Sequence, residues 1–435
     1  MKSRQQREGG WIVLLAVLAM LAITIAFLGA AANNSSAKLE RRDITTTALA
    51  QAKTALLAYS ISRDDIYNGT RPGEFPCPTL VAPGTSGYGT AATGCVTRRI
   101  GRLPWQTLGI PELFDASGEP LWYALSSKFN PSTTTININT RADIVLYATD
   151  GITVQQPEVV AMIFAAGAPL DYQNRSSVST ASCAAASATT LVRNVCADNY
   201  LDSSAGRNNA SNAGPYIAAM AAPTFNDAVV SITTSDFMPE IERRIGINLV
   251  QTLKAYYINS NSDPMKRYYP NPVFFSDVIL APSANNRTSC SLNNYQGRFP
   301  EYINQVAFPP FKPPLCVGQN DWPSVGLAGS LPSWFFVNQW HLAIYYAVGK
   351  AYVLGGTKLC LLPGDCLTVD TDPNVQAIVM LPGTQLTNQN RPSNSLTDYF
   401  EIPENLDGWS LSNNYVYKTA PRVSASSDRV IAIKN

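Results

Sequence analysis

The feature that most constrains this chain is a long apolar run, Trp11–Ala32, which begins after a short basic N-terminus. The run contains no charged residue, no Asn or Gln, and no Pro. As an α-helix it would rise roughly 33 Å, enough to cross the hydrocarbon core of a bilayer. Because Lys2, Arg4 and Arg7 precede the run, we expect the N-terminus to stay in the cytoplasm and the rest to be exported. A secretory signal peptide cut at the small residues Gly29–Ala32 is the competing interpretation, but the apolar stretch is too long for one.

A second helical segment follows the apolar run. After a polar break at Asn33–Ser36, helix-favouring residues resume from Ala37 and continue to about Ile61. The apolar positions of this segment recur at helical spacing, at Leu49, Ala52, Leu56 and Tyr59. The sequence therefore predicts one long helix whose first half lies in lipid and whose second half packs on a domain.

This N-terminus resembles those of the type IV pilin and type II secretion pseudopilin families. The resemblance lies in the basic leader ending in Gly9-Gly10, in the apolar run directly after it, and in the amphipathic continuation. It implies that a prepilin peptidase cuts between Gly10 and Trp11, where family members usually begin with Phe or Met. The fifth mature residue is usually Glu, and here it is Leu15. Large tip-type minor subunits of the superfamily tend to lack this Glu, so Leu15 fits a tip subunit; it also fits a membrane protein that never polymerises.

Composition narrows the function classes. The chain has 435 residues, a formal net charge of +1 and only 14% charged residues, with no basic stripe. These values give nucleic-acid binding little support, and the length is ordinary for two exported domains. The abundance of Ser, Thr, Asn, Gly and Pro is typical of an exported, loop-rich domain that contains β-structure.

Eight cysteines indicate disulfide bonds on the exported side of a membrane. Zinc is disfavoured because no pair has C-x-x-C spacing and the chain has one histidine. Taken in chain order, the cysteines form four local pairs, although other connectivities stay open: Cys77 with Cys95, Cys183 with Cys196, Cys290 with Cys316, and Cys360 with Cys366.

The two halves of the chain repeat one another. Pro157–Arg175 and Pro373–Arg391 match at one constant offset, and both end in Gln-Asn-Arg. Four further pairs of similar segments occur in the same order in the two halves: Leu56–Ile61 with Leu253–Ile258, Leu103–Trp105 with Leu331–Trp334, Trp122–Ala124 with Tyr345–Ala347, and Asp227–Ile232 with Asp428–Ile433. Such self-similarity sets the architecture before any single motif does.

The duplication leads to a predicted fold class of α+β: a long N-terminal transmembrane and amphipathic helix, then two related pilin-like domains of helix plus antiparallel sheet. The predicted bounds are a leader at 1–10, a transmembrane helix at 11–32, a first domain at 33–233 and a second at 234–435. Ala142–Ala148 and Val159–Ala165 are predicted strands, and Met238–Ile258 is the predicted helix of the second domain. Pro72–Pro78, Gly101–Gly109 and Asp115–Tyr123 are similar to segments of large pilin-like proteins from bacterial secretion or pilus clusters.

Catalytic patterns are weak. His341 is the only histidine and lies among aromatic residues, which favours a packed, hydrogen-bonded side chain. Ser126 and Lys128 have a spacing that is common by chance, and the glycine-rich segment Pro83–Gly94 lacks the Gly-Lys-Ser/Thr of a phosphate loop. We therefore expect no enzyme activity and no cofactor.

Two polar clusters are candidate binding sites. Asp370, Asp372 and Asn374 offer alternate oxygen side chains to calcium, but they lack the EF-hand glycine and closing Glu, so a capped turn is the plainer interpretation. The repeated triplets are candidate subunit or ligand contacts. Their duplication favours a structural role instead, in which amide and guanidinium groups bond loop carbonyls beside the sheet. The triplets are Gln173, Asn174 and Arg175 in the first half, and Gln389, Asn390 and Arg391 in the second.

Together these observations predict a minor pilin or pseudopilin that caps or initiates a type IV pilus-like or type II secretion filament. Its expected partners are the inner membrane, other pilins or pseudopilins bound through the N-terminal helix, and prepilin peptidase, with no nucleic acid. The expected location is a single pass through the inner membrane, with the C-terminal domains in the periplasm or on a surface filament. The alternative function is a membrane-anchored exported adhesin or substrate-binding protein.

Overall fold

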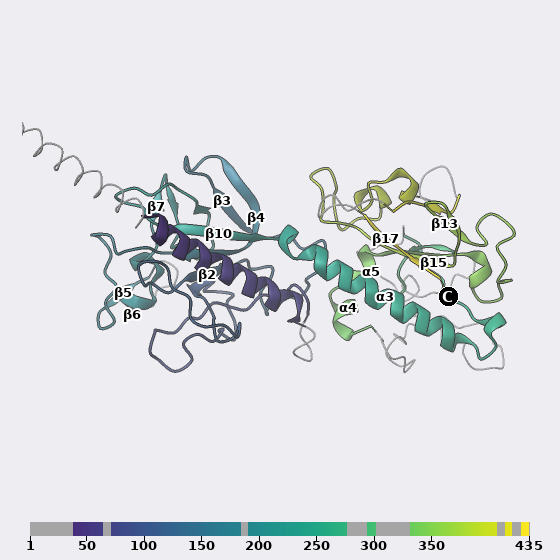
Figure 1. Ribbon diagram of the computed structural model, residues 1–435, viewed down its shortest axis with the longest axis horizontal. Helices are drawn as coiled ribbons and strands as arrows, with labels where there is room; N and C mark the ends of the chain where they lie inside the picture. Colours follow the sequence, from purple (N-terminus) through teal and green to yellow (C-terminus); the bar gives the residue numbers. More distant parts are fainter. Residues whose placement is uncertain are drawn as a thin grey trace, which may run out of the picture.

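The computed structural model describes residues 38–63, 71–183, 190–275, 294–301, 331–406, 414–419 and 428–434. These residues form two lobes that lie side by side along the molecule, and helix α3 (Met238–Ser260) runs from their junction across the second lobe (Figure 1). The first lobe contains a helix at residues 38–61 and the strands up to β10. The second lobe contains α3 and the strands from β11 onward.

The sheet of the first lobe is centred on β4 (Val154–Ala165), whose second half is buried on both faces. Such burial is expected for an apolar strand between packed layers. The neighbours of β4 are antiparallel: β2 (Trp122–Leu125) and β10 (Ala228–Thr233) pair with its second half, and β3 (Ile144–Tyr147) pairs with its first half. β1 (Ile100–Arg102) extends the sheet beyond β2, and the short β9 (Tyr216–Ile217) pairs with β3 in parallel. Two small hairpins complete the lobe, β5 (Thr180–Ser182) with β6 (Thr190–Val192) and β7 (Ser203–Ser204) with β8 (Arg207–Asn208).

The second lobe has an antiparallel sheet in the order β11 (Gln296–Arg298), β12 (Tyr345–Val348), β15 (Ala377–Leu381) and β17 (Arg429–Ile433). A smaller sheet joins β14 (Asp372–Val375), β13 (Leu367–Val369) and β16 (Val416–Tyr417). Two short helices, α4 (Ser333–Val337) and α5 (Trp340–Ala343), precede β12.

The two sheets share one connectivity. The order β1-β2-β4-β10 of the first lobe corresponds to β11-β12-β15-β17 of the second, and every one of these pairs is antiparallel. In both lobes a late two-residue strand pairs in parallel with an earlier strand, β9 with β3 and β16 with β13. Even isolated bridges correspond, because Thr79 pairs with Arg102 and Val273 pairs with Arg298. The repeated sequence therefore accompanies a repeated strand order.

One helix crosses each lobe, and Figure 1 shows the purple helix and α3 in similar positions. The helix at 38–61 buries Leu49, Ala52 and Leu56, whereas its first turns expose charged residues. α3 buries a stripe at four-residue spacing, made of Ile241, Ile245, Leu249 and Leu253. This pattern places one apolar face of each helix against its sheet.

Aromatic and aliphatic side chains fill the joint between the lobes. Phe237, the residue before α3, has its ring centroid 5.1 Å from that of Phe75 and 5.9 Å from that of Phe129. Gly73 has a φ of +91°, and a Cβ there would lie 2.9 Å from Ile136 Cγ2. Buried residues of both lobes belong to one continuous hydrophobic core.

Asn338, which ends α4 in the second lobe, bonds the first lobe directly. Its Oδ1 accepts hydrogen bonds from the amide of Ile136 (2.8 Å) and from Arg71 Nη1 (3.1 Å). Its backbone carbonyl accepts one from Asn137 Nδ2 (2.7 Å). Asn338 is 1% exposed, so these bonds are shielded from water.

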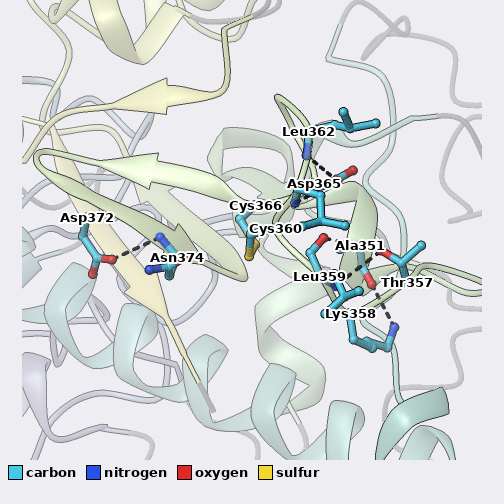
Figure 2. The surroundings of a disulfide bond; sticks show 11 residues. Ala351, Thr357, Lys358, Leu359, Cys360, Leu362, Asp365, Cys366, Asp372 and Asn374 are labelled. Atoms are coloured by element: carbon cyan, nitrogen blue, oxygen red, sulfur yellow. Dashed lines mark hydrogen bonds between the residues drawn. A yellow bond between two sulfur atoms is a disulfide. The ribbon is translucent and has the colours of Figure 1, made fainter.

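Three of the expected disulfides lie in the described residues: Cys77–Cys95, Cys183–Cys196 and Cys360–Cys366. Figure 2 shows the last of these closing a loop in which the Asp365 carboxylate accepts the Leu362 amide hydrogen at 2.8 Å. Cys290 and Cys316 lie outside the described residues.

The predicted fold class and membrane location require correction. Within the described ranges no helix combines the length and the apolar character needed to cross a bilayer. The N-terminal helix that is described covers only 38–61, the range of the predicted amphipathic half, and it begins with Lys38, Glu40, Arg41 and Arg42 on its surface. The predicted span Trp11–Ala32 lies outside the described residues. Much of what is described consists of strands in several sheets, joined by irregular segments.

Candidate functional site: the paired clasps

The two Gln-Asn-Arg triplets lie just beyond the last buried strand residues of β4 and β15, at equivalent places in the two lobes. Each triplet supplies a glutamine and an arginine that hold a loop against a turn and the start of the last sheet strand. We call these clusters the first clasp (Gln173, Arg175, Asp202, Asn209 and Asp227) and the second clasp (Gln389, Arg391, Glu401, Asn405 and Asp428).

In the first clasp, the Arg175 guanidinium bonds the backbone on both sides of its loop. Nη1 donates to the Gly167 carbonyl at 3.0 Å and pairs with Glu119 at 2.8 Å, while Nε donates to the Asn199 carbonyl at 3.2 Å. The guanidinium also lies over the Tyr200 ring, 4.6 Å from its centroid. Arg175 therefore ties the loop after β4 to the 3-10 turn η2 (Ala197–Asn199).

The second clasp repeats this arrangement with a fully buried arginine side chain. Arg391 Nη1 donates to the Gly383 carbonyl at 2.6 Å, Nη2 donates to the Tyr399 carbonyl at 2.8 Å, and Nε donates to the Asp398 carbonyl. The Arg391 guanidinium lies 5.0 Å from the Tyr399 ring centroid. Burial lowers the pKa of Arg391, against the opposing charge of Glu401.

The glutamine of each clasp orients its arginine. Gln173 Oε1 accepts from Arg175 Nη2 at 2.6 Å and from the Leu170 amide at 3.1 Å. Gln389 Oε1 accepts from Arg391 Nη2 at 2.7 Å and from the Leu386 amide at 3.0 Å. The other end of each glutamine donates to a carboxylate, Asp202 at 2.8 Å or Glu401 at 2.7 Å.

An asparagine and an aspartate form the floor of each clasp. Asn209 Nδ2 donates to Asp227 at 3.0 Å, and Asn405 Nδ2 donates to Asp428 at 3.2 Å. Asp227 and Asp428 directly precede β10 and β17, so each floor fixes the start of the last sheet strand.

Each clasp also brings two carboxyl groups together in a poorly solvated place. Burial, with the charge of Asp202, raises the pKa of Asp227 to about 8. Burial, with the hydrogen bond and charge of Asp428, raises the pKa of Glu401 to about 8. One carboxyl of each pair therefore keeps its proton near neutral pH.

The exposed members of the triplets are the asparagines. Asn174 Oδ1 accepts the Ser176 amide hydrogen at 3.1 Å, and the Asn390 amide donates to Asp398 at 3.0 Å. Arg175 and Arg391 are engaged internally and point away from solvent. The geometry thus gives the triplets a loop-holding role and leaves only Asn174 and Asn390 within reach of a partner.

The structure does not gather the calcium candidates into a common site. Asp370 accepts the Thr419 amide hydrogen at 3.0 Å, while Asp372 pairs with Lys434. Figure 2 shows Asp372 also accepting the Asn374 amide hydrogen, at 3.1 Å. Throughout the described ranges, no group of three or more His, Cys, Asp or Glu side chains is placed to hold a metal ion.

The remaining candidates are placed as follows. His341 is buried on α5 beside Phe336, with Nε2 3.5 Å from Glu301. Ser126 Oγ donates to Asp143 at 2.7 Å and accepts the Lys128 amide hydrogen at 3.2 Å, so Lys128 approaches the serine through its backbone. The predicted cleavage site, Gly10 and Trp11, lies outside the described residues.

Sequence reasoning missed one exposed residue beside the first clasp. Tyr172 is 57% exposed, and its hydroxyl donates to Asp202 at 2.6 Å. The duplication could have revealed Tyr172, because the matching position of the second half holds Asn388 and the two halves therefore differ there. Tyr172 borders a pocket of about 300 Å³.

Comparisons with known proteins give no relative from which a role can be transferred: no family model, curated protein or solved structure matches the chain.

Proposed function

We propose that this chain is a non-catalytic minor subunit of a pilin- or pseudopilin-type filament, and that it acts at one end of the filament as a cap or initiator. The proposal rests on the leader ending in Gly10, on Leu15 in place of the usual Glu, and on a structural feature, the joint between the lobes.

The packed joint between the two lobes is the observation that supports a mechanical role for the chain. A cap transmits load only if its lobes move together. Here Phe237 packs on the first lobe while the rest of α3 packs on the second, and Asn338 bonds backbone groups across the boundary. A continuous apolar core with shielded hydrogen bonds resists relative motion of two domains far better than a flexible linker does.

Disulfides support the same role. Three of them close local loops, as is common in proteins that work in oxidising compartments outside the cytoplasm. Filaments of the proposed class are assembled there.

Deletion of the gene in cells that produce this chain tests the proposal. We expect fewer filaments per cell, with filaments of ordinary length, because an initiator sets number and not extension. Tagged chain should co-purify with sheared filaments at far below stoichiometric amounts. Unchanged filament number together with no co-purification would contradict the proposal.

The N-terminus of the mature chain gives an independent test. Intact-mass measurement should find Trp11 as the first residue in cells that process other prepilins. Gly10→Ala should block this cleavage, and Gly9→Ala serves as the matched neighbouring control. An unprocessed Met1 in such cells would count against membership of the filament class.

A further inference from the structure

The internal duplication shows where the first clasp departs from the common plan. The two clasps share their glutamine, arginine, asparagine and aspartate. The lobes differ, however, at two neighbouring places beside the first clasp. Tyr172 occupies the position of Asn388. Between the clasp carboxylate and the clasp asparagine, the first lobe has Ser203–Asn208, whereas the second has only Ile402–Glu404.

The longer segment folds into the β7–β8 hairpin, which stands beside Tyr172. Together they enclose a pocket of about 300 Å³, near the lower end of the range for small-ligand sites. Its lining combines Tyr172 and Leu201 with four polar residues, Asp198, Ser203, Asn208 and Thr224. Because local departures from a consistent plan concentrate at functional sites, this pocket is the strongest candidate for one.

The Tyr172 ring is exposed and held in place. Its hydroxyl is fixed by Asp202, which is 1% exposed and is itself held by Gln173. An aromatic side chain held in this way loses little further freedom when a ligand stacks on it. The clasp therefore supports a rigid aromatic platform at a position where the second half has Asn388.

The polar lining offers unused hydrogen-bonding groups. Asn208 Oδ1 accepts the Ala210 amide hydrogen at 2.8 Å, which leaves Nδ2 directed elsewhere. Within the described parts of the chain, Asn208 Nδ2 and the hydroxyls of Ser203 and Thr224 have no hydrogen-bond partner. These neutral donors and acceptors, set beside an exposed ring, complement a molecule with several hydroxyl groups and one apolar face.

We propose that the pocket beside Tyr172 binds a neutral sugar residue, whose C–H face stacks on Tyr172 and whose hydroxyls bond Ser203, Asn208 and Thr224. Asp198 and the clasp carboxyls disfavour an anionic ligand at the same place. Because hydroxyl and amide groups outnumber the one carboxylate of Asp198, the lining favours a sugar over a simple cation. This binding does not depend on the filament role.

Ligand-observed saturation-transfer NMR on the full chain tests the proposal. The probes are N-acetylglucosamine and the methyl glycosides of glucose, galactose and mannose, each at millimolar concentration. We expect at least one probe to receive saturation, and Tyr172→Ala to weaken its binding at least about tenfold. Tyr172→Phe should retain most of the binding because the ring remains. The matched control is Asn388→Ala, the equivalent position in the second lobe, which should bind as the parent chain does.

A second variant separates binding from folding. Ser203→Trp fills the pocket from an exposed hairpin position that takes no part in the clasp, so it should block binding while circular dichroism and thermal unfolding stay unchanged. The proposal is overturned if none of the four probes receives saturation, if Tyr172→Ala and Ser203→Trp bind as well as the parent, or if methylammonium binds in place of the sugars.

Discussion

At the scale of single residues, the two clasp arginines are charged groups that the fold has taken out of water. Arg391 has no exposed side-chain surface, and it donates to three backbone carbonyls, two of them in buried hydrogen bonds. Arg175 serves two carbonyls and a carboxylate in the same way. Removing such a group leaves its partners unpaired, and this loss costs more than the bonds themselves contribute.

Arg391→Ala should therefore lower the free energy of unfolding by about 3–5 kcal/mol. Urea titration followed by aromatic fluorescence measures the change. The matched control is Arg141→Ala, which removes an exposed partner of Glu158 and should change stability by less than about 0.5 kcal/mol. Equal effects at the two positions would show that the second clasp is not a stabilising element.

The paired carboxyls predict a pH dependence. The pKa of Asp227 is about 8 in the folded chain and near 4 when unfolded. Because the folded pKa is the higher one, its contribution to stability is complete below about pH 4 and is lost as the pH rises toward about 8. Asp202 and Arg175 are the charged groups that influence this carboxyl. The Asp227→Asn variant keeps a neutral group there at every pH.

The stability of the parent chain, relative to Asp227→Asn, should fall by at most about 1.4 kcal/mol for each pH unit in that interval. Urea midpoints at successive pH values give the difference. A difference that does not vary with pH would mean that Asp227 is already ionised in the folded chain.

Residue-level prediction from sequence succeeded where the chain repeats itself. The triplets were recognisable because duplication placed Gln, Asn and Arg at one offset, and amide and guanidinium groups have an obvious use beside loop carbonyls. The partners of Arg391 on Tyr399 and Asp398 were not predictable, since only the tertiary fold brings that turn to the triplet. Tyr172 was not predictable from the residues that the two triplets share, because it lies where the two halves differ, opposite Asn388.

At the scale of elements, the two helices approach their edge strands differently. Aligning Leu56–Ile61 with Leu253–Ile258 places Leu49 opposite Gly246. A Cβ at Gly246 would lie 2.4 Å from Ile431 Cδ1, so α3 sits close against β17. In the first lobe the larger Leu49 lines an open groove of about 380 Å³ between the helix and β10.

Gly246→Leu should push α3 away from β17 and lower the free energy of unfolding by about 1–3 kcal/mol, although leucine is the better helix former. Ile247→Leu, at the neighbouring half-exposed position, is the matched control and should have little effect. Chemical denaturation measures both. A stabilised Gly246→Leu chain would show that helix propensity outweighs packing here.

Elements with a strong periodic signal were predictable. The predicted helix from Met238 corresponds to α3, and the predicted strand Val159–Ala165 lies within β4. The parallel pairs of β9 and β16 were not predictable, because two-residue strands carry no periodicity and their partners lie far away in sequence. The predicted long N-terminal helix was wrong as a fold description, because within the described residues the first helix covers only 38–61 and no helix there is long and apolar enough to cross a bilayer.

At the scale of the whole molecule, the shared core implies that the lobes unfold together. Asn338 provides the polar contacts of that coupling. The sequence repeat could not predict them, because a joint between two copies occurs only once in a chain. Its Oδ1 satisfies the buried amide of Ile136 and the guanidinium of Arg71. Loss of this acceptor leaves the buried amide of Ile136 unpaired, whereas Arg71 keeps its bonds to the Thr133 and Thr134 carbonyls and its pair with Glu74.

Asn338→Ala should weaken the coupling and split a single calorimetric unfolding transition into two, one for each lobe, with the less stable lobe losing about 1–3 kcal/mol. Asn338→Asp keeps the acceptor oxygen opposite Arg71 but loses the Nδ2 donor to the Trp334 carbonyl, so as the matched control it should keep a single transition at a lower stability than the parent chain. If Asn338→Ala still unfolds in one transition, the apolar contacts of Phe237 with Phe75 and Phe129 suffice to couple the lobes. The rigidity of the joint would then come from the start of α3 alone, and Phe237→Ala would be the substitution that separates the lobes.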